Sequence, residues 1–427
     1  KERLAPMPGI PSTILQFGGA AGDAGYVATN DNSGNFALNR LVLTNETASG
    51  SNTVLLGGNL EFWGAGAGIG QWAAGGFTIT NNLVLMTDIF LDGTGTGLGM
   101  VASNITGNGT VMHRGAWPVA LRGSNTWVGA LVLAGTNATL RLESTNALIG
   151  VGTIIASNGT VYVTNNAVVF TLGNNSNRNA LATGSGTLWS NAPNVRLNIG
   201  RGATLSVAAG AQLACGELTL GGDSSASYGL VVTNGGRVNS IWPAVIGTNA
   251  STNAVLVTGS GSLWNLGGSN LYVVWLGTTG NVLVLDQGGM VSNLGTLVVY
   301  GNSNQVSLLG GTLSVTNMLV TNGLWFMVGD GTQAATLKVG SGPATFGGGL
   351  LVQSNGSLQA AGLLNGAVNG VVVTNGGVFS AGLSGPGSLT IAGSNLTWCG
   401  GGIYQCEITD VSLGAGIGWD LVMVSTQ

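Results

Sequence analysis

Residues 230–293 repeat one short phrase three times. The copies read LVVTNGGRVNS (230–240), VLVTGSGSLWN (255–265) and VLVLDQGGMVSN (282–293). In each copy apolar residues occupy every second position, a corner with glycine follows, and a second short apolar segment comes next. Alternation with a period of two is typical of a β-strand with one buried face. A glycine at a fixed place indicates a bend that a side chain would obstruct.

The phrase continues well outside this window. Its corner residue occurs 12 times, with 11 intervals over 268 residues and a mean interval of about 24 residues, at Gly109, Ala138, Gly159, Gly186, Gly210, Gly236, Gly261, Gly289, Gly311, Ala335, Gly356 and Gly377. Repeats of ~20–50 residues indicate a solenoid, propeller or array, and a propeller blade needs about 40–45 residues. The shorter unit predicts an all-β fold, a single-stranded parallel β-helix (β-solenoid) with about 24 residues per coil.

Composition supports a buried β core without a membrane span. Only 6% of the residues are charged, yet 44% are hydrophobic and the mean hydropathy is +0.40, which is too apolar for a disordered chain. No run of 18 or more apolar residues occurs, so we expect no transmembrane segment. The net charge of −4 and the singly dispersed arginines argue against nucleic acid as a partner.

The polar residues are mostly uncharged, and lysine is scarce. A surface of Asn, Thr and Ser favours an extracellular or cell-surface location, with an export signal that is not part of this chain. The charge pattern changes little along the sequence, so the repeat predicts one elongated body with different ends.

Four segments are expected. Residues 1–17 form an extended N-terminal arm, 18–35 a Gly/Asn-rich loop or N-terminal cap, 36–388 the β-solenoid, and 389–427 a C-terminal cap or coupling segment with longer, hairpin-like strands. The ends of a solenoid are sheet edges, which natural proteins usually block with polar or charged units. Both ends here carry little charge, which favours self-association, either head to tail or by strand addition. We therefore expect either a surface rod or a self-assembling filament subunit.

The N-terminal arm contains Pro6, Pro8 and Pro11, which fix φ and remove backbone donors. One strand is expected directly after them, at Ser12, Thr13, Ile14, Leu15, Gln16 and Phe17. This strand either folds back over the first coil or adds to an open sheet edge of a neighbouring molecule.

Cys399 and Cys406 flank Gly400–Gly402, which we expect to be the turn of a hairpin. A disulfide across this hairpin and two reduced thiols are both consistent with the sequence. Cys215 lies in an apolar run and is expected to be a small core residue.

Groups that would carry catalysis, bind a cofactor or ligate a metal are sparse. His113 is the only histidine and is expected at the surface or at a corner. Asp88 and Asp92 would lie about 13 Å apart along one strand, too far for a glycosidase pair from this strand alone. The other acids are isolated along the repeat: Glu143, Glu217, Asp223, Asp286 and Asp330. Of these, Asp286 and Asp330 are expected to be turn residues. We therefore expect a protein that is not an enzyme and takes no cofactor; the alternative is a polysaccharide lyase or glycosidase on the same scaffold.

Trp189 and Trp264 occupy matching positions 75 residues apart. If the preceding leucines point inward, both indoles point outward, where they could stack on sugar rings or join neighbouring rods; otherwise each packs beneath a loop. Nine Asn-x-Ser/Thr sequences are explained by turn chemistry without glycosylation: Asn45, Asn104, Asn108, Asn137, Asn158, Asn174, Asn249, Asn355 and Asn395.

Three stretches resemble the passengers of autotransporter-type bacterial surface proteins, including the autotransporter-associated β-strand repeat proteins. Two of them, VTGSGSLWNLGGSNLYV (257–273) and GNVLVLDQGGMV (280–291), resemble the passenger repeats themselves, and the third, GGGIYQCEITD…GIGWDLVMV (400–424), is similar to the segment that follows the repeats. The resemblance implies a right-handed β-helix, export, and an adhesive or structural role with glycans or cell surfaces as partners. It implies no catalytic residues.

Overall fold

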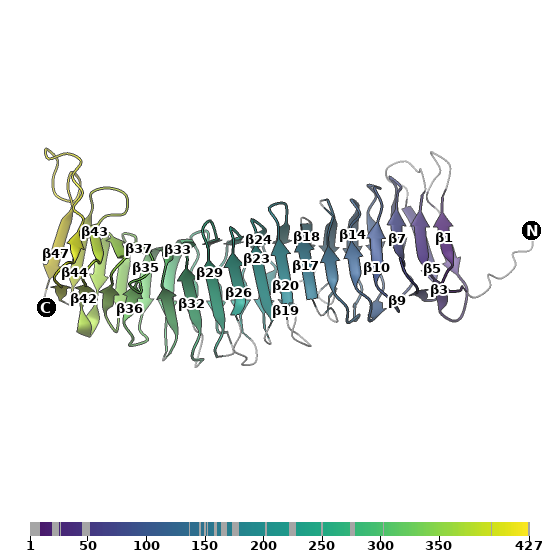
Figure 1. The fold of residues 1–427 in the computed structure, drawn as a ribbon, viewed down its shortest axis with the longest axis horizontal. Helices are drawn as coiled ribbons and strands as arrows, with labels where there is room; N and C mark the ends of the chain where they lie inside the picture. Colours follow the sequence, from purple (N-terminus) through teal and green to yellow (C-terminus); the bar gives the residue numbers. More distant parts are fainter. Residues whose placement is uncertain are drawn as a thin grey trace, which may run out of the picture. The chain divides into compact units, whose positions relative to one another are not determined.

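The computed structural model describes most of the chain: residues 9–18, 25, 27–44, 52–135, 137–144, 147–148, 151, 153–157, 160–163, 169–172, 179–200, 203–221, 228–248, 251–273, 278–301, 303–393 and 395–425. These residues belong to two compact units, Lys1–Val195 and Arg196–Gln427. In each unit short strands stack side by side in parallel (Figure 1). Together the units contain about 14 turns of ~24 residues, and the predicted β-solenoid is confirmed.

Unit 1 contains three ladders of parallel strands. Ladder A consists of β1 (Ile14–Phe17), β4 (Arg40–Leu43), β7 (Gly68–Gln71), β10 (Ile89–Asp92), β13 (Val111–His113), β15 (Leu131–Leu133), β17 (Thr153–Ser157) and β20 (Asn179–Thr183). Ladder B consists of β2 (Val27–Asn30), β5 (Asn52–Gly57), β8 (Gly76–Ile79), β11 (Gly99–Val101), β14 (Pro118–Leu121), β16 (Thr139–Leu142), β18 (Thr160–Val163) and β21 (Leu188–Asn191). Ladder C consists of β3 (Phe36–Leu38), β6 (Leu60–Phe62), β9 (Leu83–Leu85) and β12 (Ile105–Gly107), and the unit also holds β19 (Val169–Leu172).

Unit 2 repeats this plan. Its ladder A is β23 (Thr204–Ala208), β26 (Tyr228–Thr233), β29 (Ala254–Thr258), β32 (Val282–Asp286), β34 (Gln305–Leu308), β36 (Phe326–Val328), β39 (Leu350–Val352), β42 (Val371–Val373) and β45 (Leu396–Trp398). Its ladder B is β24 (Gln212–Cys215), β27 (Arg237–Ser240), β30 (Leu263–Asn265), β33 (Gly289–Val299), β35 (Gly311–Val320), β37 (Ala335–Val339), β40 (Gly356–Ala360), β43 (Val378–Ala381) and β46 (Ile403–Tyr404). Ladder C is β22 (Arg196–Ile199), β25 (Leu218–Leu220), β28 (Ala244–Ile246), β31 (Leu271–Val273), the second halves of β33 and β35, β38 (Pro343–Phe346), β41 (Gly362–Asn365), β44 (Ser388–Ala392) and β47 (Leu421–Ser425). A 3₁₀ turn, η1 (Ala367–Asn369), precedes β42.

The register of ladder A reproduces the repeat length. Leu41 pairs with Ile69, 28 residues later, whereas Leu308 pairs with Val328, 20 residues later. The coils therefore vary in loop length while their strands stay aligned. This explains why the corner residues recur at an uneven spacing.

The core consists of inward-facing side chains from successive coils. Leu230, Val255 and Leu283 stack directly on one another in ladder A, and all three are fully buried. A single coil cannot bury such a face, so each coil depends on its neighbours. This is why every second residue of the strands is apolar.

Asparagines form a second, polar stack at one corner of unit 2. The Asn281 side chain donates to Oδ1 of Asn304, 3.0 Å away, and its own Oδ1 accepts from the Asn253 side chain at 2.9 Å. Asn281 and Asn304 are fully buried, and buried amides of this kind must be hydrogen-bonded. The high asparagine content thus has a structural use inside the corners.

The ends differ from the sequence-based expectation. Residues 18–35 are not only a loop, because β2 lies within them and pairs with β5. Beyond residue 389, β46 pairs in parallel with β43, and β47 with β44, so these strands continue the solenoid. Within the described part of this segment, the expected hairpin-like pairing occurs only between them, where Ile408 and Trp419 form an antiparallel bridge and the amide of Thr409 donates to the Gly418 carbonyl at 2.8 Å. The strands in these segments pair with strands of the following or preceding coil, so the solenoid extends past both predicted boundaries.

Candidate functional site

The terminal coil of unit 2 has an open edge. Its strands β45, β46 and β47 pair on one side with β42, β43 and β44, and no described strand pairs with their other side. An unpaired edge presents a row of free backbone donors and acceptors, which is a template for another strand.

Aromatic side chains cover part of this edge. The rings of Trp398 and Tyr404 lie 5.9 and 6.0 Å from that of Phe379, and 6.3 Å from each other. Phe379 is fully buried, but Trp398 and Tyr404 are 39% and 40% exposed because no described coil follows them. Burial, helped by Asp420 and Cys406, raises the pKa of Tyr404 to about 12, so the phenol is neutral. The two exposed rings are therefore a neutral aromatic surface, with the Asp420 carboxylate close to Tyr404.

In the described part of unit 1, the first coil likewise has an edge with no partner strand. Leu15 and Phe17 of β1 pair with the buried Leu41 and Leu43 of β4 and are themselves only half-buried. A largely apolar cavity lies at this end, with Leu15, Phe17, Ala28, Phe36, Leu41 and Leu60 among its lining residues. The core of unit 1 thus reaches the solvent here.

The predicted arm strand is shorter than expected and lies on its own chain. β1 covers Ile14–Phe17 of the expected Ser12–Phe17, while Thr13 closes a turn by donating its amide to the Ile10 carbonyl. Parallel pairing of β1 with β4 agrees with the fold-back alternative. Strand addition to a neighbour uses the other edge of β1 and stays a prediction, and residues 1–8 lie outside the described part of the chain.

Cys399 and Cys406 do not flank a hairpin. The amide of Cys399 donates to the Val373 carbonyl of ladder A, and that of Ile403 to the Gly377 carbonyl beside ladder B. Gly400–Gly402 therefore form a corner between two ladders. Cys399, Cys406 and the buried Cys215 are all free thiols, and Cys215 is a core residue as predicted.

The prediction that Trp189 and Trp264 point outward is wrong. Both are fully buried, and each packs in ladder B against an inward-facing valine, Val161 or Val238. The indole nitrogens donate to buried polar partners, Oδ1 of Asn191 at 3.1 Å and, for Trp264, Oγ of Ser240 at 3.0 Å. Neither indole is available for contact with a glycan or another rod.

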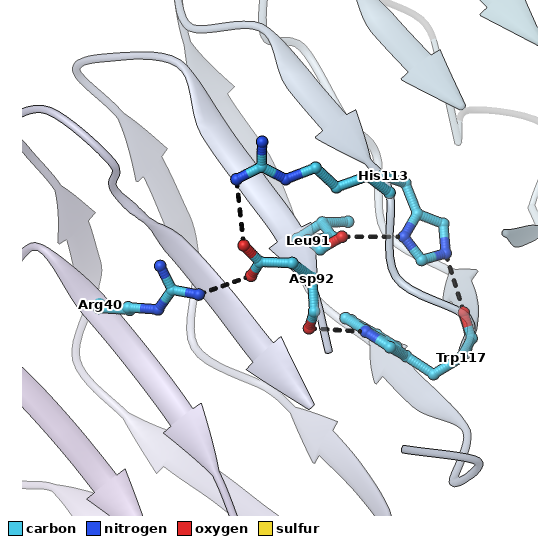
Figure 2. Close-up of polar contacts among 6 residues, drawn as sticks. Arg40, Leu91, Asp92, His113 and Trp117 are labelled. Carbon is cyan, nitrogen blue, oxygen red and sulfur yellow. Dashed lines mark hydrogen bonds and ion pairs between the residues drawn. The ribbon is translucent and has the colours of Figure 1, made fainter. Parts of the chain in front are cut away.

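His113 is also buried, contrary to the expectation of a surface or corner position. Its ring nitrogens lie 3.3 Å from the Leu91 carbonyl and 2.9 Å from the Trp117 carbonyl (Figure 2). Burial lowers the pKa of His113 in spite of these backbone contacts. The imidazole is therefore neutral, and His113 is part of the buried core.

Asp92 lies between two guanidinium groups (Figure 2). It accepts from Arg40 at 2.7 Å and from Arg114 at 3.2 Å, and the Arg114 guanidinium covers the Phe90 ring at 3.8 Å. Both carboxylate oxygens of Asp92 are therefore engaged by guanidinium groups. The cluster ties β4, β10 and the residue after β13 together on the outer surface of ladder A.

The remaining acids stay apart, as predicted. Glu143 pairs with Arg122 and Arg141, and Glu217 pairs with Arg196. Asp88 accepts from the Thr110 amide, and Asp286 and Asp330 accept from amides just after them, as turn residues do. Asp223 lies outside the described residues. Across the described ranges, no three metal-ligating side chains gather at one place.

The described sequons fit turn chemistry in part. Asn355 has a positive φ of 61°, a turn conformation that asparagine tolerates. Asn104 instead accepts from the Ser124 amide, 20 residues later in the next coil. Asn45, Asn158, Asn174 and Asn249 lie outside the described residues. Glycosylation stays untested.

Comparisons with protein-family models, curated proteins and solved structures found no match for this chain. The resemblance to autotransporter passengers therefore stays a prediction. Within the described part of the chain no helix has the length and apolar character needed to cross a bilayer.

Proposed function

We propose that this protein is a non-enzymatic structural subunit of the cell exterior whose copies associate end to end. The observation that carries the proposal is the pair of terminal coils, whose strands pair with described strands on one side only and whose core side chains are partly exposed. The extracellular location and an adhesive role rest on the uncharged Asn/Thr/Ser composition.

The unpaired strand edges of the two terminal coils are complementary in hydrogen-bonding direction. Among the described strands, β1 pairs only with a strand of the following coil and β45 only with a strand of the preceding coil, so the two strands leave opposite sides unpaired. A second copy therefore continues each ladder as one coil continues the next. Such a contact uses different surfaces on the two copies and does not close, so it propagates into a filament.

The ladder A strands define a register for this contact. Leu396 and Trp398 follow the buried Val371 and Val373 and therefore face inward. If all three residues of β45 pair with β1 of the next copy, Leu396 lies against Leu15 and Trp398 against Phe17. The contact then buries apolar side chains that are exposed in the single molecule.

Sedimentation velocity over a range of protein concentrations, with electron microscopy of the same samples, tests the proposal. The native chain should form linear oligomers that lengthen with concentration. Leu15→Lys and Trp398→Lys each place a charge inside one edge strand, a device that blocks edge pairing, and each should leave single molecules.

Tyr300→Lys is the matched control, because Tyr300 is exposed but lies away from both terminal coils. It should assemble like the native chain. The proposal fails if the native chain stays monomeric at every concentration, or if the control loses assembly as fully as the edge variants.

A further inference from the structure

Ladder A of unit 2 contains a split next to β36. β36 pairs with β39 along all three of its residues, but it pairs with β34 only through Val328 and Leu308. The first parts of β34 and β36 therefore diverge and leave a surface hollow, which reaches the core side chains Val306 and Phe326.

Trp325 forms one wall of the hollow and is 40% exposed. Its six-membered ring lies against the backbone of Gly349, where an added Cβ would be 2.7 Å from Cζ3 of the indole. The loop before it is fixed by Asn322, which donates to the Asn304 carbonyl at 2.6 Å and accepts from the Leu324 amide at 3.1 Å. Trp325 is thus a fixed aromatic platform.

Polar groups line the same hollow as this platform. Gln305 and Asp330 are exposed, Gln353 is half-buried, and all three line the hollow. Hydrogen bonds from the hydroxyl and amide of Thr332 lower the pKa of Asp330, so its carboxylate is an acceptor at neutral pH. The amides of Gln305 and Gln353 add donors and acceptors.

We propose that this hollow binds a neutral polysaccharide, with one sugar ring stacked on Trp325 and with hydroxyls along the bound chain hydrogen-bonded by Gln305, Gln353 and Asp330. A sugar ring has an apolar C–H face and a rim of hydroxyls, which match an aromatic platform with polar groups around it. No Lys or Arg lines the hollow, whereas Asp330 does, so a neutral sugar is favoured over an acidic one.

Affinity electrophoresis tests this site. The native chain is run in native gels that contain hydroxyethyl cellulose, laminarin, galactomannan or arabinoxylan, all soluble neutral polysaccharides. At least one should retard it. Trp325→Ala should raise the dissociation constant for that polysaccharide at least tenfold. Truncating an aromatic side chain at the centre of a binding site typically costs more than about 1.4 kcal/mol of binding free energy. Gln353→Leu, which removes only the amide, should weaken binding about three- to tenfold.

Trp242→Ala is the matched control, since Trp242 is an exposed tryptophan of the same unit that does not line the hollow. It should bind like the native chain. The inference is overturned if none of the four polysaccharides retards the native chain, or if Trp325→Ala binds as the control does. Loss of binding in Trp325→Ala with full binding in Gln353→Leu also overturns it, because that result describes an apolar patch only. Trp325 is remote from both terminal coils in sequence, so Trp325→Ala should still assemble, and the two proposals fail independently.

Discussion

The indole nitrogen of Trp264 donates a hydrogen bond to the Ser240 hydroxyl, 3.0 Å away, with both side chains fully buried. Trp264→Ala should lower the free energy of unfolding of unit 2 by about 3–5 kcal/mol, because it leaves a large cavity in the stack. Ser240→Ala should cost about 1–3 kcal/mol, because the indole nitrogen loses its partner. Urea denaturation followed by circular dichroism measures both, and Trp242→Ala at the surface should change stability by about 0.5 kcal/mol or less. Equal effects of the two tryptophan variants would contradict the buried position.

Stability should fall in mildly acidic solution because of His113. Burial lowers its pKa in the folded chain from the ordinary 6.5, so the unfolded chain binds the proton more readily. The stability that the neutral imidazole contributes is fully present above pH 6.5 and is lost as the pH falls toward the lowered folded pKa. The melting temperature of His113→Gln should accordingly change less between pH 7 and pH 5 than that of the native chain. Parallel melting curves over this range would count against a buried neutral histidine.

The three thiols should react at very different rates. Cys406 is exposed and Cys399 half-buried, whereas burial raises the pKa of Cys215 to about 12, and the thiolate is the reactive form. In the native protein a thiol reagent such as DTNB should label Cys406 and Cys399 and leave Cys215 unlabelled until urea is added. Labelling of both terminal cysteines only after reduction would instead demonstrate a disulfide between them.

The ion pairs of Asp92 with two guanidinium groups should make a salt-dependent contribution to the free energy of unfolding. Asp92→Asn keeps the shape but removes the charge that pairs with Arg40 and Arg114. Since these groups are partly exposed, we expect a loss of about 1–2 kcal/mol in the free energy of unfolding at low salt, and a smaller loss in 1 M NaCl. Arg196→Gln, which breaks a single ion pair with Glu217, is the comparison and should cost less. A loss that is the same at both salt concentrations would assign the effect to packing.

The sequence was sufficient to predict the coil but not which side chains face outward. Val255 and Val257 face inward, then Gly259 and Gly261, both with positive φ, turn the chain. After the turn the alternation restarts in the opposite phase, so Ser262 is buried with Trp264 and Leu263 is not. A shift of one residue moves every side chain to the other face, and the phase across a glycine corner is set by the neighbouring coil. The same reason explains the wrong prediction for Trp189.

The local sequence likewise does not determine which strands pair with each other. Three glycines between two short strands fit a hairpin and a solenoid corner equally well. The choice is made by Val373 and Gly377, whose carbonyls accept from Cys399 and Ile403 and which lie one coil earlier. Trp325 was missed because its platform depends on Gly349 in the next coil, and its own sequence context carries no repeat signal.

Disulfide trapping between copies tests the end-to-end contact most directly. Leu15→Cys and Leu396→Cys are placed in separate chains that both carry Cys399→Ser and Cys406→Ser, and the two chains are mixed under mild oxidation. Strands of one ladder lie about 4.8 Å apart, which suits a disulfide, so a covalent heterodimer should form on non-reducing gels, while mixtures with Tyr300→Cys in place of Leu396→Cys should stay monomeric. A heterodimer yield no higher than in the Tyr300→Cys mixture would contradict the account.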